Sequence, residues 1–116
     1  MQISRLNTTA LWSDATLYNG IAHFVEVPAD TRVDFQAQLQ QLLSQAAQTL
    51  VSIGSSPAQL LSATIYLTDR ANVAALNQAW QQWLPAGCAP SRACIKAELL
   101  DSAMLVEIAF VAAYAA

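Results

Sequence analysis

An arginine and a glutamate stand out near the end of the chain, in the stretch PSRACIKAELLDSAMLVEIAFVAA. Arg92 begins a run of β-forming residues, and Glu107 interrupts a nearly unbroken apolar run fifteen positions later. Only 11% of the residues are charged, against about 25% in an ordinary soluble domain, so each ionic side chain requires a physical explanation. A guanidinium and a carboxylate can serve a ligand together, or they can form a structural ion pair that seals a subunit interface. The residue pattern by itself favours the structural ion pair and leaves the ligand site open.

Few other side chains offer chemistry. Cys88, Cys94 and the single histidine, His23, are too few for a disulfide framework or a zinc site, so we expect reduced thiols, no metal and no cofactor. Cys94 is a poor candidate for a nucleophile because no histidine accompanies it. His23 stands alone in a predicted strand, where we expect a surface or edge position without a role.

Charge and amide content argue against two classes of partner. The five basic residues are scattered singly and the formal net charge is -3, whereas nucleic-acid binding depends on clustered contacts with phosphates. Glutamines recur through the uncharged stretch from Phe35 to Thr68, so it contains no run of about 18 apolar residues that could cross a membrane. The N-terminal segment MQISRLNTTALW lacks the pattern of a secretory signal, and we expect a cytoplasmic protein.

Turn signals and hydrophobic period predict the elements that must position these residues. An Asn-Gly pair between two β-compatible runs predicts a hairpin with strands near 15–19 and 21–27, because both residues tolerate positive φ. Apolar residues at helical spacing then predict one long amphipathic helix, with Asp30 or Thr31 as its N-cap and Gly54 as its stop.

The second half of the chain adds a strand, a helix and two more strands. The first of these strands ends at Asp69, which can cap the helix, and Asn77 lies on the apolar stripe of that helix. The last two strands are predicted near 91–98 and 104–113. The order ββαβαββ predicts an α+β two-layer sandwich in a single domain, residues 1–116, with two helices on one face of a mixed sheet.

The last two strands are expected to form a hairpin. Side chains alternate along a strand, so Arg92 and Lys96 share one face of theirs. A turn centred at 99–100 would set Arg92 opposite Glu107, and a turn centred at 101–102 would set Lys96 there. Both registers place the cations and the glutamate on the same sheet face, and the sequence does not choose between them.

One face of this sheet has no helix to cover it, yet the last predicted strand is apolar on both faces. Hydrophobic residues make up 55% of the chain, and soluble monomers seldom leave a large apolar patch exposed. The simplest physical resolution is a symmetric homo-oligomer that covers this face with another copy of the chain.

Three segments of the chain carry a resemblance to a known family. The segments PSRAC and VEI together resemble a C-terminal family signature. The arginine of the first segment and the glutamate of the second are fifteen positions apart, as in that signature. The segment DRANVAALNQAWQQW resembles the second helix of the same family, with Asn77 at a recurring asparagine, and Trp12-Ser13-Asp14 resembles one of its subgroups. The family is RidA, also called YjgF or reactive intermediate deaminases, and the resemblance covers nearly the whole chain.

The resemblance implies a homotrimer of chorismate-mutase-like fold with clefts between subunits. Family members hydrolyse short enamine and imine acids, released by pyridoxal-phosphate enzymes, to 2-oxo acids and ammonia. By resemblance, Arg92 would hold the substrate carboxylate in a two-pronged ion pair, and Glu107 would position or deprotonate the attacking water. Cys94 and Asn77 would line the cleft.

Two segments depart from the family pattern. Val25-Glu26 aligns with a serine-glycine pair, and Trp12 stands where the archetype has a tyrosine. A carboxylate at Glu26 would oppose anionic ligands unless it points away from the site. The alternative function is therefore a non-catalytic binder of small carboxylate metabolites on the same trimer. Chorismate mutase chemistry is disfavoured, because a dicarboxylate substrate would require several convergent cations and only Arg92 is well placed.

Overall fold

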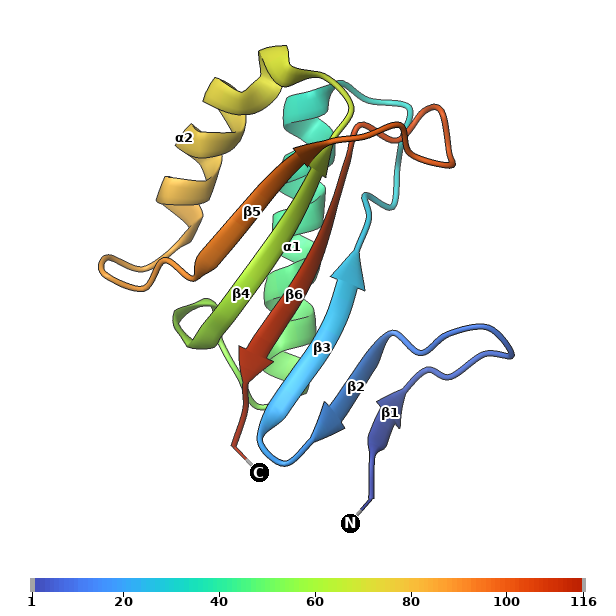
Figure 1. Ribbon diagram of the computed structural model, residues 1–116, viewed down its shortest axis with the longest axis vertical. Coiled ribbons are helices and arrows are strands. Elements are labelled where there is room, and N and C mark those ends of the chain that lie inside the picture. The colour runs from blue at the N-terminus through green and yellow to red at the C-terminus, as the bar shows by residue number, and fades with distance from the viewer. Residues whose placement is uncertain (1, 116) are drawn as a thin grey trace.

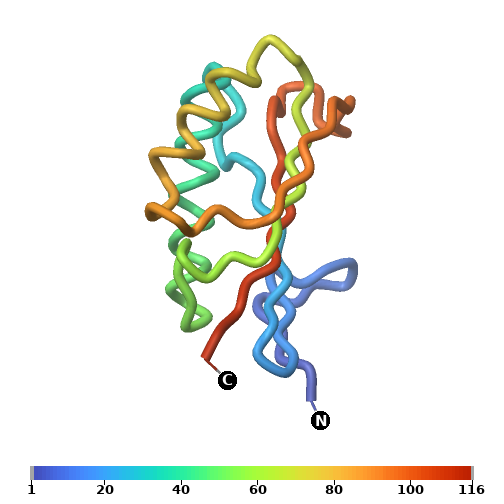
Figure 2. Tube along the Cα trace, turned by 60° about the vertical axis from the view of Figure 1, so that its left-hand side comes forward, coloured from blue at the N-terminus to red at the C-terminus, as the bar shows by residue number. Residues whose placement is uncertain are grey.

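The computed structural model describes residues 2–115, which form a six-stranded mixed sheet with two α-helices on one face (Figures 1 and 2). This architecture confirms the predicted α+β sandwich. It adds a short strand, β1, ahead of the predicted order. The elements are β1 Ser4–Leu6, β2 Ala15–Tyr18, β3 Ile21–Glu26, α1 Phe35–Ser52, β4 Leu60–Leu67, α2 Val73–Trp83, β5 Ser91–Lys96 and β6 Val106–Ala113, with single 3-10 turns at Pro57–Gln59 and Arg70–Asn72.

The order of the strands in the sheet is β1-β2-β3-β6-β4-β5. The predicted hairpin of β5 with β6 is therefore wrong, because β4 lies between them, antiparallel to β6 and parallel to β5. The physical reason is the connection through α2: a helix between two strands returns the chain so that the strands can lie side by side in parallel. Every residue of β5 is exposed, as befits an edge strand, whereas alternate residues of β4 are buried.

The core lies between the sheet and the two helices. Phe110 is buried at the centre of β6, with its ring 5.0 Å from that of Phe24 and 6.3 Å from that of Trp80 on α2. Trp83 is half-buried and packs beside Trp80, as the helical spacing predicted. Neither helix of the described chain is long and apolar enough to cross a membrane.

Helix α1 begins later than predicted. Its N-cap is Asp34, whose carboxylate accepts a hydrogen bond from the backbone N–H of Ala37, and neither Asp30 nor Thr31 has this role. Asp30 instead forms an ion pair with Arg32, at 3.0 Å from Oδ1 to Nε. The predicted end is confirmed, since α1 ends at Ser52 with Ile53 as its C-cap, and Gly54 follows with φ +78°.

The turn between β2 and β3 requires a left-handed backbone at both central residues. Asn19 has φ 54° and Gly20 has φ 83°, which confirms the hairpin predicted from the Asn-Gly pair. A Cβ at position 20 would lie 3.9 Å from the carbonyl oxygen of Tyr114, an ordinary contact, so only the backbone conformation disfavours a larger residue there.

Gly20→Ala should therefore lower the free energy of unfolding by about 1 to 2 kcal/mol, the cost of a left-handed conformation for a residue with a Cβ. The midpoint of urea denaturation measures this loss. Asn19→Gly is the matched control, because glycine accepts the same conformation and should leave the midpoint nearly unchanged. A Gly20→Ala midpoint equal to that of the wild type would contradict the assignment of backbone strain to this turn.

Candidate functional site

The pairing of the strands assigns Arg92 and Glu107 to opposite faces of the sheet. Glu107 is half-buried and lies opposite Tyr66 of β4, on the face without helices. Arg92 lies opposite Ala63, which is 2% exposed and faces the helices, so Arg92 projects from the helix side of the edge strand. The expectation that both residues share one face of a C-terminal hairpin is wrong because β4 intervenes.

The two residues are also far apart within one chain. Two strand spacings of about 4.8 Å and an offset of three residues at about 3.3 Å each put their Cα atoms about 14 Å apart. Across residues 2–115 the one salt bridge joins Arg32 to Asp30. Arg92 and Glu107 therefore do not form a structural ion pair within the chain.

A first group of candidate residues gathers around β5. Arg92 and Cys94 are two positions apart on β5 and share its helix-side face, and both side chains are exposed. Asn77 is exposed on α2, which lies over the β5 side of the sheet (Figure 1). Its predicted place on the buried stripe is wrong, because Leu76 and Trp80 are the residues of α2 that are buried.

A second group gathers at the end of the sheet where β3 stops and β6 starts. Val25 lies opposite Ala109 and is 53% exposed on the face without helices, the same face as Glu107. Trp12 is 62% exposed in the loop between β1 and β2, where its backbone N–H and carbonyl both hydrogen-bond to Thr9. The structure thus separates the candidates of the β5 group from those of the β3–β6 group.

Glu26 belongs to neither exposed cluster, because its side chain turns toward helix α1. Its Oε2 accepts a hydrogen bond from the hydroxyl of Thr49 at 3.1 Å. Burial raises the pKa of Glu26 above its usual value, and the Thr49 hydrogen bond opposes this only in part. The carboxylate therefore lies on the opposite side of the sheet from Glu107.

Tyr66 is a neighbour of the candidate site that the sequence did not indicate. It is half-buried directly across from Glu107, and its hydroxyl has no hydrogen-bond partner among the described residues. Only the pairing of β4 with β6 brings the two residues together, and periodicity within one segment contains no information about pairing.

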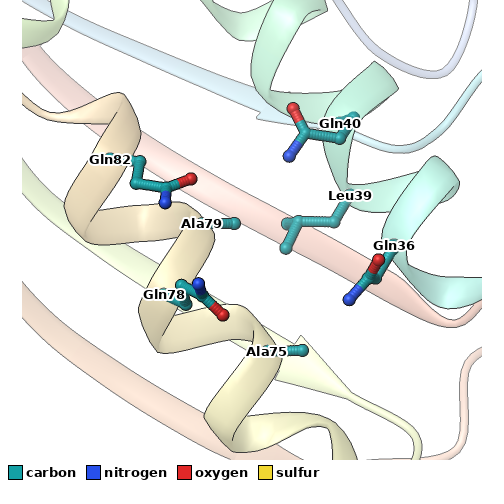
Figure 3. A pocket seen from close by; sticks show the side chains of 7 residues that line it. All are labelled: Gln36, Leu39, Gln40, Ala75, Gln78, Ala79 and Gln82. Atoms are coloured by element: carbon teal, nitrogen blue, oxygen red, sulfur yellow. The ribbon is translucent and has the colours of Figure 1, made fainter.

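Two hollows on the surface are lined by none of the candidate site residues. A groove of about 190 Å³ between α1 and α2 is lined by amide and apolar side chains, with no ionisable group (Figure 3). These side chains are Gln36, Leu39, Gln40, Ala75, Gln78, Ala79 and Gln82. A second hollow, of about 350 Å³, lies under the loop before β6, where Glu98 and Asp101 would repel an anion. Neither hollow suits a carboxylate ligand, and no group of three or more potential metal ligands occurs in the described part of the chain.

Comparisons with known proteins agree with this arrangement of elements. The family model described as Endoribonuclease L-PSP matches residues 2–114. The RutC family protein YoaB of Escherichia coli is 37% identical over 97% of this chain and 99% of its own length. A RutC family protein of Haemophilus ducreyi is 38% identical over 96% of each chain.

Two solved structures are similar to this chain in both sequence and fold. A crystal structure of a Pseudomonas aeruginosa protein has a TM-score of 0.94 and 37% identity, and the match covers 98% of this chain and 100% of that one. A member of the YjgF protein family from Neisseria meningitidis has a TM-score of 0.94 and 33% identity, over 100% of this chain and 98% of its own. The similarity therefore extends over the whole fold.

The raised pKa of Glu26 predicts a pH-dependent effect on stability. A carboxyl group whose pKa is raised in the folded state does not affect the free energy of unfolding at pH values below its usual pKa. As the pH rises through the raised value, the group ionises where it is partly buried and the free energy of unfolding falls. Glu26→Gln keeps an acceptor for Thr49 and removes the charge. Its melting temperature should match that of the wild type near pH 3 and exceed it by a few degrees at most near pH 7.

Thermal unfolding followed by circular dichroism at both pH values measures this difference. Glu98→Gln, which removes the same charge from an exposed loop residue, is the control for net charge. A lower melting temperature for Glu26→Gln at neutral pH would show that the carboxylate stabilises the fold, contrary to the desolvation argument.

Proposed function

The chain belongs to the endoribonuclease L-PSP family, whose members are also named RutC, YjgF or Rid proteins, and from this premise we propose that it hydrolyses short enamine and imine acids. The products are 2-oxo acids and ammonia. Membership of the family supports the coarser statement that the role is that of a small-molecule deaminase or of an endoribonuclease-like protein.

The observation that carries the proposal is the separation of Arg92 from Glu107. Within one chain they lie on opposite faces with β4 between them, so they can serve one small ligand only if two copies contribute. The face without helices supports such an assembly, since neither helix of residues 2–115 covers its half-buried and exposed apolar residues. These include Val25, Ile95, Ala109, Val111 and Ala113. We propose a homotrimer in which Arg92 of one copy approaches Glu107 of its neighbour.

The chemistry at such a site requires no covalent intermediate. The Arg92 guanidinium binds the substrate carboxylate through two hydrogen bonds and fixes its orientation. Glu107 accepts a proton from a water molecule, whose oxygen attacks the electrophilic imine carbon. Glu107 returns this proton to the imine nitrogen, which gives a carbinolamine. The proton of the new hydroxyl group then passes to the amino group, the carbon–nitrogen bond breaks, and ammonia leaves as the carbonyl forms. Asn77 and Cys94 would come from the copy that supplies Arg92, and Trp12 and Val25 from the copy that supplies Glu107.

Two other functions are less well supported. Cleavage of RNA would require clustered cations, whereas only Arg92 and Lys96 share a strand face and Arg32 already pairs with Asp30. A non-catalytic binder would use the same arginine for a small carboxylate, and the kinetic experiment below separates it from the enzyme. The position of Glu26 favours neither function, because it faces α1.

The assembly should be measurable by light scattering. We expect a mass three times the 12.5 kDa of the chain at micromolar concentration. Val111→Asp places a charge on the face without helices and should shift the mass toward that of a single chain. Val51→Asp is the control, since Val51 is 73% exposed on α1 and should not affect assembly. A wild-type mass of one chain would refute the shared site.

The reaction can be followed with 2-aminocrotonate generated by a serine or threonine dehydratase. We expect the wild type to accelerate formation of the 2-oxo acid and Arg92→Ala to lose this acceleration. Losing a desolvated guanidinium that pairs with a ligand carboxylate costs about 2 to 5 kcal/mol, whereas an exposed structural pair costs about 1 or less. Glu107→Gln should still bind 2-oxobutanoate and react slowly.

Two results would contradict the proposal. If the wild type binds 2-oxobutanoate through Arg92 but does not accelerate hydrolysis of 2-aminocrotonate, the protein is a non-catalytic binder and the proposed enzyme activity is wrong. A wild type that neither accelerates the reaction nor binds 2-oxobutanoate, together with an Arg92→Ala variant that dissociates into single chains, would contradict both functions. Arg92 and Glu107 would then be an ion pair at the subunit interface.

A further inference from the structure

Three glutamines on one side of α1 hydrogen-bond to backbone groups of distant segments. Gln41 accepts from the N–H of Asp30 at 2.9 Å and donates to the carbonyl of the same residue at 3.1 Å. Gln45 accepts from the N–H of Ala29 at 3.0 Å and donates to the carbonyl of Val27 at 2.7 Å. Both glutamines therefore hold only the connection between β3 and α1.

Gln38 reaches a different segment. Its Oε1 accepts from the N–H of Leu105 at 2.9 Å, and its Nε2 donates to the carbonyl of Ala103 at 3.0 Å. The same Nε2 lies 3.1 Å from the carbonyl of Val33 and 3.2 Å from that of Thr31. Gln38 is 0% exposed and is the one fully buried polar residue in the described part of the chain. Its amide thus joins the segment before α1 to the segment before β6.

This amide fixes the backbone that leads directly into the candidate site. Leu105 immediately precedes β6 and stands two residues before Glu107. The carbonyl of Leu105 also accepts from the N–H of Thr68, although at a longer 3.4 Å. At Leu105 the hydrogen bond to Gln38 is therefore the shorter of the two, and it acts just before the pairing of Val106 and Glu107 with β4 begins.

We propose that Gln38 is a positioning residue for Glu107: it sets the position of the first residues of β6 and, through them, the direction of the Glu107 carboxylate. This inference rests on the proposed function for its kinetic consequence. Misplacing a catalytic group by about 1 Å can cost about a hundredfold in rate. Arg92 lies on another strand, two spacings away, so Gln38 acts on the water-handling residue and leaves carboxylate binding unaffected.

The amide group is required because one side chain must donate and accept at the same place. Methionine has a similar length but removes the amide, so the N–H of Leu105 and the carbonyl of Ala103 both lose their hydrogen bonds to α1. A glutamate can replace the amide only while its carboxyl is protonated, since the ionised group cannot donate and would face three carbonyl oxygens.

The test compares Gln38→Met and Gln38→Glu with Gln41→Met, a matched control on the same helix that loses three backbone hydrogen bonds, to Asp30 and Ala37, but none to residues 103–105. We expect both Gln38 variants to lower kcat for 2-aminocrotonate hydrolysis about tenfold to a hundredfold, with KM changed less than about twofold. Gln41→Met should retain the wild-type kcat. In Gln38→Glu the deficit should grow from about pH 5 to about pH 8, whereas the control should follow the wild-type profile.

Amide hydrogen exchange at Leu105 and the carbon-13 resonance of the Glu107 carboxyl group provide readouts that do not depend on turnover. Faster exchange at Leu105 and a displaced Glu107 resonance in the Gln38 variants, with wild-type values in Gln41→Met, support the inference even if the wild type proves not to be a hydrolase. A folded Gln38→Met with wild-type kcat, or with an unchanged Glu107 resonance, would overturn it. An equal loss of kcat in Gln41→Met would also overturn it, because the effect would then be general destabilisation.

Discussion

Strand β4 is hydrogen-bonded along both edges, antiparallel to β6 and parallel to β5. This double pairing brings Tyr66 across from Glu107 and moves Arg92 to the far edge of the sheet. A parallel neighbour reached through a helix is the normal result of a strand, helix, strand sequence, and the fully exposed β5 can occupy only an edge. The two charges that the sequence isolates therefore cannot meet in one chain, and a site that uses both must involve a second copy.

The two faces of the sheet differ in what they carry. The helix face holds the core, where Phe110 packs against Phe24 and Trp80. The other face carries Glu107, Tyr66 and Val25 among apolar residues, and neither helix of residues 2–115 lies over it (Figure 2). The apolar surface on which we base the proposed assembly therefore also surrounds the candidate carboxylate.

The sequence predicted the elements well, because their signals are local. The Asn-Gly turn and the end of α1 at Gly54 each depend on residues a few positions apart, and both are present. Asp69 accepts a hydrogen bond as predicted, but it caps the 3-10 turn Arg70–Asn72, and the N-cap of α2 is Asn72. Strand pairing is not local, which is why the C-terminal hairpin was expected and is absent. The direction of Glu26 and the buried amide of Gln38 were missed for the same reason: each depends on a contact with a distant segment, Thr49 for the one and Ala103 and Leu105 for the other.

The central claim is that Arg92 and Glu107 act together from different copies of the chain. The most direct test unfolds Arg92→Ala and Glu107→Gln together, refolds them as a mixture and compares its hydrolysis of 2-aminocrotonate with that of each variant refolded alone. If neighbouring copies share the site, random assembly of equal amounts restores both side chains in about a quarter of the sites, and activity returns to that fraction. A mixture that has formed mixed assemblies but is no more active than the separate variants would contradict the account.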